Sequence, residues 1–478
     1  MKLYELLENL NVEHSHLENI EVGKVTCDSR AVDAGDVFVC INGVSVDGHK
    51  FADKAVEHGA SVIVCERDLG YSNQIVVENT RKVYALLCGK YFGEPSKKIK
   101  LVGVTGTNGK TSTCMLLKHI LESNGYKVGL IGTVQNMVGD SVLPAKNTTP
   151  DAFELHSLFS LMVMAGCDYV VMEVSSHAID QDRVYGLHFE SAVFTNLTQD
   201  HLDYHKTMEN YLDVKKRLFS MCNSAVVNLD DEYSKDIISV CKCKTVTYST
   251  KRNDSSFSGK NIKQKVDGVD FEMVGDGVIG RAKIKTPGLF SVYNAMAASV
   301  CAIELGIPFS NVLNSLLTAP KVKGRAEVVP TGKDFSVVID YAHTPDGLKN
   351  ILSVMNEVKE GRLITVFGCG GDRDKDKRPK MGLIASKYSD MIIVTSDNPR
   401  SEDPIQIIND IVEGIKETFT PYEVIENRET AIQYAITHAQ KGDIILLAGK
   451  GHETYQILSN TTIHLDEREI VADVLKGM

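Results

Sequence analysis

Short apolar runs alternate with longer segments of helical periodicity along most of the chain. Runs of strand length occur at residues 37–41, 61–65, 101–104, 127–133, 168–174, 191–196, 336–340, 363–367, 391–395 and 444–448. Segments whose apolar residues recur three or four positions apart occur at residues 51–58, 82–92, 114–123, 291–305, 343–360, 404–416 and 429–440. Strands that alternate with helices form largely parallel, doubly wound sheets, so the pattern predicts an α/β fold.

Two breaks in this pattern, at residues 93–98 and near residue 328, divide the chain into three units. The predicted domains are a small α/β N-terminal domain at 1–97, a central domain with a mostly parallel sheet at 98–328 and a Rossmann-like C-terminal domain at 329–478. Within the central domain, residues 251–285 alternate polar and apolar positions and predict antiparallel strands. Residues 1–10 predict an amphipathic helix.

A glycine-rich stretch lies between the strand predicted at 101–104 and the helical segment after it. It reads Gly103-Val104-Thr105-Gly106-Thr107-Asn108-Gly109-Lys110-Thr111-Ser112-Thr113. Its glycines allow a tight turn that presents backbone N–H groups to anionic oxygens. Lys110 is placed to reach terminal phosphates, and Thr111 to offer a hydroxyl to Mg²⁺. Val104 stands where the strict pattern has its first glycine, but the strand and helix favour nucleoside triphosphate binding over an ordinary loop.

Polar residues also follow other predicted strands of the central domain. Glu173 ends one strand, and residues 195–205 follow the next. Ligands gather at the carboxyl ends of strands in such sheets, so we expect both to meet the phosphate loop. Glu173 would complete the oxygen shell of Mg²⁺ beside ATP or GTP. His201 and His205 have the spacing of a zinc pair, but Asp203 lies between them without an H-E-x-x-H motif, and we favour a histidine near Mg²⁺.

The composition limits the classes of function. The chain has 478 residues, 43% hydrophobic and 24% charged residues and a net charge of −11. A negative balance argues against nucleic-acid binding, which depends on neutralising phosphates. No apolar run approaches the ~20 residues that cross a bilayer. The eleven cysteines form no C-x-x-C pair, and nothing resembles a signal peptide. We therefore expect a cytoplasmic monomer that binds small molecules, not nucleic acid or membranes.

Five motifs, in order, resemble those of the Mur ligase family of peptide-bond-forming enzymes, over essentially the whole chain. They occupy residues 105–111, 173–177, 195–203, 340–345 and 368–373. The resemblance implies an ATP-dependent ligase of peptidoglycan precursor synthesis. Within the family, residues 28–30, 397–400 and 449–453 indicate the addition of the third amino acid, meso-diaminopimelate, to UDP-MurNAc-L-Ala-D-Glu through an acyl phosphate.

The resemblance also implies site residues. ATP would be bound by Gly106, Thr107, Asn108, Gly109, Lys110, Thr111, Ser112, Asn294, Arg325 and His343. The UDP-linked dipeptide would be bound by Ser29, Val44, Ser45, Val46, Asn147, Thr148, Thr149, Ser175, Gln181 and Arg183. Magnesium would be held by Thr111, Glu173, His201 and a carbamylated Lys215, and Lys110, Glu173, His201 and Lys215 would be catalytic. Diaminopimelate would be bound by Arg373, Asp397, Asn398, Pro399, Arg400, Gly449 and Glu453.

Two of these residues, Lys215 and Arg400, differ in the support that their own chemistry gives to the implied role. Lys215, followed by Lys216 and Arg217, reads as an ordinary solvated helix face, so its role comes from the resemblance alone. Arg400 has an independent argument, because a guanidinium can bind the second carboxylate of diaminopimelate bidentately while Glu453 pairs with the distal ammonium.

Three alternatives stay open from the sequence. The first is the lysine-adding relative, which has the same fold and chemistry. The second is a folate-type polyglutamate ligase, which would not need the N-terminal unit. The third is a nucleotide-dependent switch without catalysis.

Overall fold

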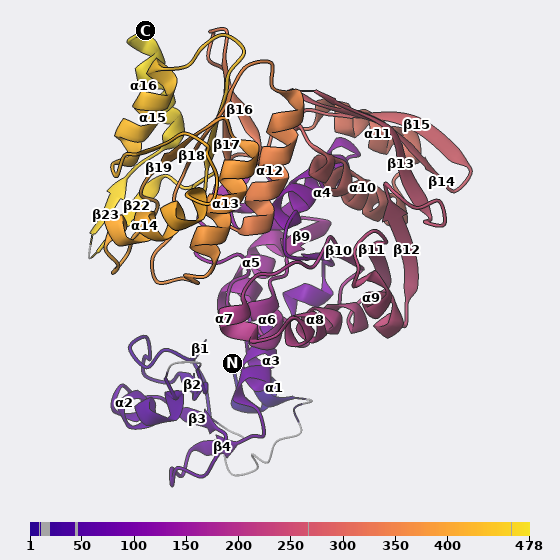
Figure 1. Cartoon of the computed structure of the whole chain (residues 1–478). Coiled ribbons are helices and arrows are strands. Elements are labelled where there is room, and N and C mark those ends of the chain that lie inside the picture. The colour runs from indigo at the N-terminus through magenta and orange to yellow at the C-terminus, as the bar shows by residue number, and fades with distance from the viewer. Residues whose placement is uncertain (9, 11–19, 44–45, 266, 460) are drawn as a thin grey trace.

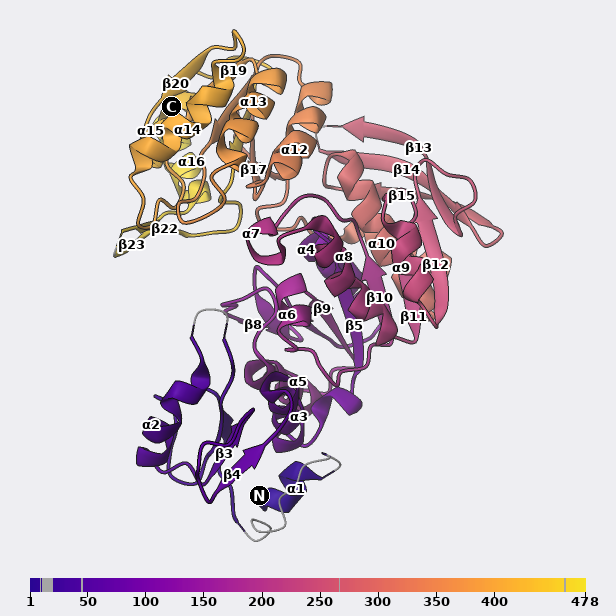
Figure 2. The same cartoon turned by 60° about the horizontal axis from the view of Figure 1, so that its bottom comes forward.

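Three large sheets, one in each of three lobes, organise the chain in the computed structural model (Figure 1). The structure describes residues 1–8, 10, 20–43, 46–265, 267–459 and 461–478. The N-terminal and C-terminal lobes lie at opposite ends of the middle lobe (Figure 2). The predicted three-part α/β architecture is confirmed. In the part of the chain described, no helix is both long and apolar enough to cross a membrane.

Four short parallel strands form the sheet of the N-terminal lobe, in the order β1-β2-β3-β4. They are β1 (Val25–Thr26), β2 (Val37–Val39), β3 (Val62–Cys65) and β4 (Gln74–Val76). The helical elements are α1 (Leu3–Leu7), η1 (Gly48–Phe51), α2 (Ala52–Glu57), α3 (Thr80–Tyr91) and η2 (Pro95–Lys97). Every residue of β2 and β3 is buried, as their unbroken apolar runs predict.

The middle lobe is built on an eleven-stranded sheet, in the order β15-β14-β13-β12-β11-β10-β5-β9-β6-β7-β8. Its strands are β5 (Lys100–Thr105), β6 (Val128–Ile131), β7 (Asn136–Val138), β8 (Ser141–Leu143), β9 (Tyr169–Glu173), β10 (Ser191–Phe194), β11 (Ser224–Asn228), β12 (Lys244–Ser249), β13 (Phe257–Lys265), β14 (Gly268–Gly275) and β15 (Val278–Ile284). All pairs from β13 to β6 are parallel, and those at both edges are antiparallel.

Helices cover both faces of this sheet. They are α4 (Lys110–Ser123), α5 (Ala152–Met164), α6 (Ser176–Asp180), α7 (Leu202–His205), α8 (Met208–Lys216), η3 (Arg217–Ser220), α9 (Ser234–Val240), α10 (Leu289–Glu304) and α11 (Phe309–Thr318). Successive side chains of a strand point to opposite faces. Val193 accordingly packs in the core that contains α4 and α10, whereas its neighbours Ala192 and Phe194 pack in the core that contains α5 and α8.

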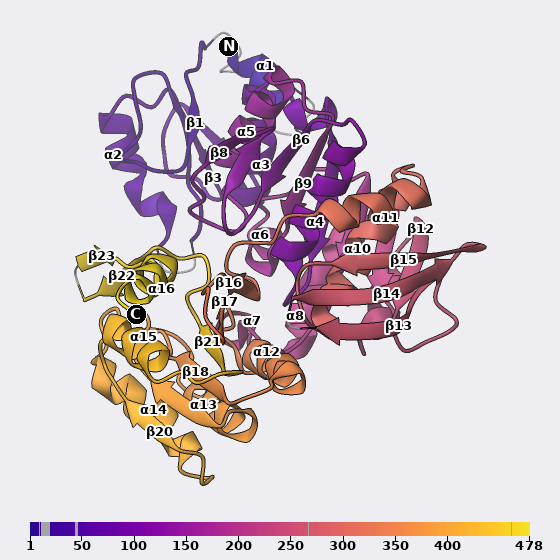
Figure 3. The ribbon, with the colours of Figure 1, turned by 90° about the horizontal axis from the view of Figure 1, so that it is seen from above.

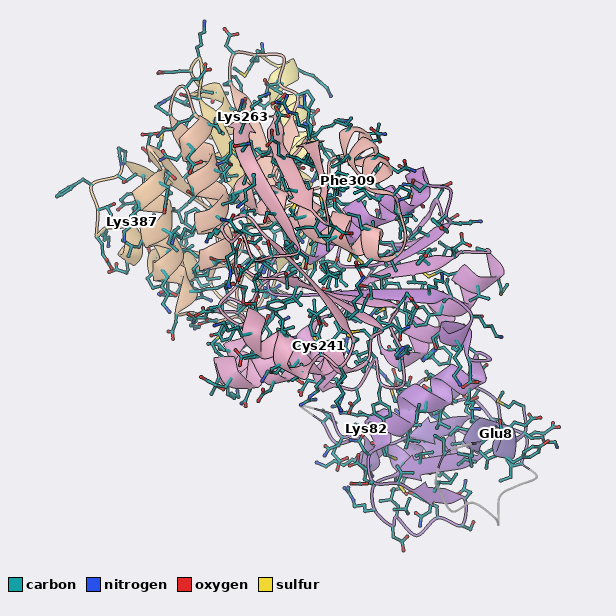
Figure 4. All side chains as sticks on the ribbon, turned by 90° about the vertical axis from the view of Figure 1, so that its right-hand side faces the viewer. Glu8, Lys82, Cys241, Lys263, Phe309 and Lys387 are labelled. Carbon is teal, nitrogen blue, oxygen red and sulfur yellow. The ribbon has the colours of Figure 1, made fainter. Side chains whose placement is uncertain are left out.

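The predicted antiparallel segment at 251–285 corresponds to β13, β14 and β15. It is not a separate sheet, because β13 pairs in parallel with β12 and so extends the central sheet. Figure 4 marks this extension by Lys263, on β13, and Phe309, on the neighbouring helix α11.

The C-terminal lobe contains a six-stranded sheet, in the order β16-β17-β21-β18-β19-β20, and a separate hairpin. The strands are β16 (Glu327–Val329), β17 (Ser336–Asp340), β18 (Leu363–Phe367), β19 (Met391–Val394), β20 (Tyr422–Val424), β21 (Ile444–Ala448), β22 (Tyr455–Leu458) and β23 (Thr461–His464). The helices are α12 (Pro345–Val358), α13 (Lys377–Tyr388), α14 (Pro404–Ile415), α15 (Arg428–Thr437) and α16 (Glu467–Lys476). Only β16 runs antiparallel to its neighbour in the six-stranded sheet.

The hydrophobic pattern does not predict helix α13. Its sequence contains Pro379 and Gly382, which have low intrinsic helix propensity. Close packing against α14 explains its formation. A Cβ atom at Gly382 would lie 2.1 Å from the carbonyl oxygen of Ile411, and one at Gly414 would lie 1.8 Å from that of Pro379. Both glycines therefore let the helix backbones approach each other.

Helix boundaries differ from the predictions where polar residues begin a helix. Helix α4 begins at Lys110 rather than at residue 114, because its first turn contains polar residues of the phosphate loop. The N-terminal helix extends over Leu3–Leu7, and residues 9 and 11–19 lie outside the described part.

We expect Arg428→Met to destabilise the C-terminal lobe. Arg428 and Glu467 are both buried, and the guanidinium donates to Glu467 Oε1 at 2.8 and 2.9 Å and to the carbonyl oxygen of Ala448 at 2.9 Å. Removing the cation leaves a carboxylate buried without its partner, which costs about 3–5 kcal/mol in the free energy of unfolding. Urea unfolding measures the change.

The matched control is Arg281→Met, because the Arg281 side chain is 89% exposed. It should change the free energy of unfolding by less than about 0.5 kcal/mol. Equal unfolding midpoints for the two variants would contradict the role assigned to Arg428.

Candidate active site

The phosphate loop connects β5 to α4 and lies against the carboxyl end of β10. Gly106 and Gly109 have φ angles of +150° and +87°, which disfavour other residues. A Cβ atom at Gly106 would lie 1.9 Å from Thr195 Oγ1, and one at Gly109 would lie 2.3 Å from Asn294 Oδ1. Both glycines are therefore required by conformation and by space.

Residues of a second predicted motif hold the loop in place. Thr195 Oγ1 donates to the carbonyl oxygen of Asn108 at 2.7 Å, and the Asn108 N–H donates to Asn196 Oδ1 at 2.9 Å. Lys110 Nζ donates to the carbonyl oxygens of Gly106 and Thr107 at 2.8 and 2.9 Å. The lysine therefore folds over the loop, where it can meet a bound phosphate.

Glu173 and two threonine hydroxyls provide the oxygen donors beside the loop. Glu173 Oε1 accepts from Thr111 Oγ1 at 3.0 Å and from the Thr133 N–H at 2.8 Å, and Glu173 Oε2 accepts from Thr133 Oγ1 at 3.0 Å. Among the described residues, no group of three or more His, Cys, Asp or Glu side chains could hold a metal. A hydroxyl and a carboxylate fit Mg²⁺, which keeps several waters and substrate phosphates as its other ligands.

Lys215 is buried, contrary to the solvated helix face that its sequence suggests. Its side chain lies 4.7 Å from the ring centroid of Tyr211, and its Nζ is 3.4 Å from Thr105 Oγ1. Burial, and secondarily the nearby charge of Lys110, lower the pKa of Lys215 well below its usual value. Its neighbour Lys216 instead bonds to Asp213 at 2.9 Å. The surroundings of Lys215 therefore favour the uncharged form of its amine.

The two histidines predicted as alternatives face different surroundings. His201 precedes α7 with φ of +55° and lies edge-on to His177, with ring centroids 4.8 Å apart. His205 is buried and bonds to Ser176 Oγ at 2.8 Å. Because His205 has a partner inside the lobe, the geometry favours His201 over a zinc pair as the histidine of the site.

The residues expected to bind the dipeptide form one connected group next to Glu173. Thr149 Oγ1 donates to the carbonyl oxygen of Glu173 at 2.8 Å and accepts from the Ser175 N–H at 3.0 Å. Arg183 donates to the carbonyl oxygen of Thr149 at 2.8 Å and to Gln181 Oε1 at 2.7 Å. The two other predicted residues lie outside this hydrogen-bonded group. The Thr148 hydroxyl bonds to the Thr133 hydroxyl at 3.0 Å, and Asn147 is exposed to solvent.

The residues expected to bind the uridine end lie in the N-terminal lobe. Ser29 is buried, and its carbonyl oxygen bonds to the His58 ring at 2.9 Å. Val46 is exposed. Val44 and Ser45 lie outside the described residues, so their assignment stays a prediction.

A cleft of about 700 Å³ separates the middle and C-terminal lobes. Helix α7 lies at this junction (Figure 3). The cleft is lined by these predicted residues: His201, His343, Arg373, Asp397, Asn398, Arg400, Gly449 and Glu453. Pro399 lies beside it, with its carbonyl oxygen against Gly371. The structure thus brings the predicted residues of the C-terminal pocket and His201 into one cavity, whereas Thr111, Glu173 and Lys215 do not line it.

Two contacts join the phosphate loop to later parts of the chain. Arg325 Nη2 donates to Thr111 Oγ1 at 3.2 Å, and Asn108 Nδ2 donates to Asp346 Oδ2 at 3.0 Å. A small cavity of about 20 Å³ behind the loop is lined by Ser112 and Asn294. The residues predicted to surround ATP therefore converge from both lobes.

Sequence reasoning missed several polar residues of the cleft. Asp200, Asp346 and Lys377 line it, and Lys450 lies just behind its wall. The position of Lys450 between two glycines after a strand was the available signal. Its direction, towards the interior, is visible only in the structure.

Known protein families match all three lobes. The Mur ligase middle domain matches residues 104–302, the Mur ligase glutamate ligase domain residues 324–451, and the Mur ligase family catalytic domain residues 21–89. Together these matches cover most of the chain.

Relatives match it over its whole length. UDP-N-acetylmuramoyl-L-alanyl-D-glutamate–2,6-diaminopimelate ligase from Caldanaerobacter subterraneus subsp. tengcongensis is 48% identical over 479 residues, which cover 99% of both chains. The ligase 1 of the same name from Clostridium acetobutylicum is 48% identical over 466 residues, 96% of each chain. A solved structure of an enzyme of this name has a TM-score of 0.72 at 30% identity, and the match covers 100% of this chain and 99% of that chain.

We expect Gly106→Ala to weaken the binding of Mg²⁺-ATP at least about tenfold, measured by calorimetric titration. The added methyl group would displace Thr195 Oγ1 and break the hydrogen bond that holds Asn108. Gly125→Ala is the control, since Gly125 also has positive φ, +87°, but no atom within 4 Å of the added Cβ. Equal losses in both variants would show that backbone strain, not the loop contact, causes the effect.

Proposed function

The chain belongs to the Mur ligase family, and we propose that it uses ATP to join meso-diaminopimelate to UDP-MurNAc-L-Ala-D-Glu in peptidoglycan precursor synthesis. The observation that carries this proposal is the common cleft. Arg400 and Glu453 line the same cavity as His201 and His343. An amino acid bound to the C-terminal lobe would therefore face the nucleotide side of the middle lobe.

The ATP site is proposed to combine the phosphate loop with residues from two other segments. Residues 106–112 would bind the phosphates, and Asn294, Arg325 and His343 would surround the nucleotide. Mg²⁺ would be held by Thr111 and Glu173, with His201 and Lys215 near a second ion, and would neutralise charge on the transferring phosphoryl group. The oxygen donors found at Thr111 and Glu173 support this assignment.

Lys215 is proposed to react with carbon dioxide. Its neutral Nζ would attack the carbon of CO₂, forming an N–C bond and releasing a proton, which leaves a carbamate anion. Burial and the lowered pKa support this step, because only the unprotonated amine is nucleophilic. The carbamate would supply a carboxylate-like ligand that Lys215 itself lacks.

The UDP-linked dipeptide is proposed to extend from the N-terminal lobe to Glu173. Ser29 and residues 44–46 would bind its uridine end. The dipeptide end would be bound by Asn147, Thr148, Thr149, Ser175, Gln181 and Arg183. The hydrogen-bonded path from Arg183 through Thr149 to Glu173 supports this placement, because it ends beside the phosphate loop.

The diaminopimelate pocket is proposed to use opposite charges for the two groups at the distal end of the amino acid. Arg400 and Arg373 would bind the distal carboxylate, and Glu453 the distal ammonium. Asp397, Asn398, Pro399 and Gly449 would shape the pocket. Arg400 Nη1 donates to the carbonyl oxygen of Gly371 at 2.8 Å, which holds the guanidinium at the cleft.

The reaction then follows from these positions. The glutamate carboxylate of the dipeptide attacks the γ-phosphorus of ATP, which forms an acyl phosphate and releases ADP. Lys110 balances charge on the transferring group. The diaminopimelate amine next attacks the acyl carbon, phosphate leaves with the electrons of the C–O bond, and the nitrogen releases a proton to give the amide. We propose that the C-terminal lobe closes over the middle lobe to exclude water, which would otherwise hydrolyse the acyl phosphate.

The domains are proposed to be residues 1–97, 98–328 and 329–478. Separate cores in the three lobes support this division, although Ala326 packs in the C-terminal core and Ala152 in the N-terminal core. The enzyme is proposed to act as a cytoplasmic monomer on small molecules. Its eleven cysteines are all free thiols, as in a reducing compartment.

We expect phosphate release from ATP and UDP-MurNAc-L-Ala-D-Glu to require meso-diaminopimelate and not to occur with L-lysine. Arg400→Met should raise the KM for diaminopimelate at least about tenfold, because it removes the partner of the distal carboxylate. Release with L-lysine instead would overturn the substrate assignment. Release without any amino acid would favour a nucleotide switch, and release with a folate and glutamate would favour the folate-type ligase.

We expect Lys215→Ala to lower kcat about a hundredfold or more, because the carbamate would be lost from the transition-state environment. Lys216→Ala is the matched control and should retain wild-type turnover, since Lys216 bonds to Asp213 at the surface. Full activity of Lys215→Ala would remove the carbamate from the mechanism.

A further inference from the structure

Lys450 is enclosed behind the wall of the cleft. It follows β21, and its side chain is fully buried. The flanking residues Gly449 and Gly451 have φ angles of +114° and +53°. A Cβ atom at Gly449 would lie 2.8 Å from Asp397 Oδ2, and one at Gly451 would lie 2.6 Å from Tyr341 Cβ. The tight turn that these glycines permit directs Lys450 inward.

Its ammonium group is part of a closed hydrogen-bonded triangle with two residues of the pocket. Lys450 Nζ donates to Glu453 Oε2 at 2.9 Å and to Asn398 Oδ1 at 3.1 Å. Asn398 Nδ2 also donates to Glu453 Oε2 at 2.9 Å, and Asn398 Oδ1 accepts from the Ile457 N–H at 2.9 Å. These bonds fix the Asn398 amide and the Glu453 carboxylate in one arrangement.

The triangle leaves one carboxylate oxygen for a ligand. Asn398 and Glu453 line the cleft, whereas Lys450 does not. Both donors of the triangle bond to Oε2 of Glu453, and within the described residues no protein donor bonds to Oε1. Glu453 therefore presents a free acceptor to the cleft while its other oxygen is held from behind.

We propose that Lys450 is a positioning residue that orients Glu453 and also determines amino-acid specificity through its charge. This inference rests on the proposed function, because it assigns Glu453 to the distal ammonium of diaminopimelate. Lys450 itself does not touch the substrate.

The specificity follows from the balance of charges around the pocket. Lys450 neutralises Glu453, and the other acidic residue of the pocket, Asp397, lies 4.0 Å from the buried guanidinium of Arg428. Arg373 and Arg400 add positive charge along the cleft. The distal end of diaminopimelate carries an ammonium and a carboxylate, so its net charge is zero and its carboxylate meets the arginines. The distal end of L-lysine brings only a positive charge, which the pocket repels. Lys450 thus disfavours lysine without contacting it.

The test compares Lys450→Met with Lys441→Met, a change at an exposed lysine of the same lobe. The measurements are KM and kcat for each substrate, and the ratio of kcat/KM for meso-diaminopimelate to that for L-lysine. Lys450→Met should raise the KM for diaminopimelate at least about tenfold and leave the KM values for ATP and the UDP-linked dipeptide within about twofold. The ratio of kcat/KM for diaminopimelate to that for L-lysine should fall at least about tenfold. Part of this fall should be a gain in kcat/KM for L-lysine, because unneutralised Glu453 attracts the lysine ammonium. Lys441→Met should match the wild type.

A double variant, Lys450→Met with Glu453→Gln, separates charge from folding. It buries no unpaired charge, so it should fold even if Lys450→Met does not. It should bind diaminopimelate weakly and show none of the gain with lysine. A lower melting temperature with an unchanged diaminopimelate-to-lysine ratio, or a gain with lysine that persists in the double variant, would overturn the inference.

The wild-type enzyme distinguishes this inference from the proposed function. Absence of phosphate release with diaminopimelate in the wild type would overturn the proposed function and the role of Lys450 with it. Normal release in the wild type, together with an unchanged KM in Lys450→Met, would overturn the role of Lys450 alone.

Discussion

Strand β5 pairs in parallel with β9 on one side and with β10 on the other, and the register of these pairs determines where the site forms. Val104 aligns with Glu173, and Thr105 aligns with Phe194. The phosphate loop, the carboxylate and the segment that begins at Thr195 therefore leave the sheet at one edge and at one level. A shift by one residue would turn each side chain to the other face and separate these groups. The hydrogen bonds from Thr195 and Asn196 to the loop depend on this alignment.

Two buried lysines show how the surroundings of a charge determine its chemistry. Lys450 has a carboxylate partner, Glu453, and an amide oxygen, so its charge is compensated within the interior. Lys215 has a hydroxyl and an aromatic ring as neighbours, with another lysine nearby, so the interior favours its neutral form. The same residue type is thus paired with a carboxylate in one lobe and lies without a carboxylate partner, among the described residues, in the other.

The cleft depends on contacts that cross between segments distant in sequence. Asn108 of the phosphate loop bonds to Asp346 at the start of α12, and Arg325 bonds to Thr111 in the first turn of α4. These bonds hold the start of α12 and the segment around Arg325 against the phosphate loop. A ligase that phosphorylates a carboxylate and then joins an amine to it requires segments of both lobes to meet, because ATP and the amine must reach one carboxylate.

The sequence by itself determined the α/β class, the three lobes, the phosphate loop and the grouping of polar residues at strand ends, because each depends on local patterns of a few residues. Together with the family resemblance, it led to the prediction that Arg400 and Glu453 bind diaminopimelate, which remains a prediction. It did not predict α13, whose formation depends on close packing of Gly382 and Gly414 against neighbouring backbones. It did not predict that Lys215 and Lys450 point inward, since adjacent residues such as Lys216 have the same local pattern and a different environment. Only the tertiary structure decided these points, because burial and the identity of a charge's partner arise from residues far apart in the chain.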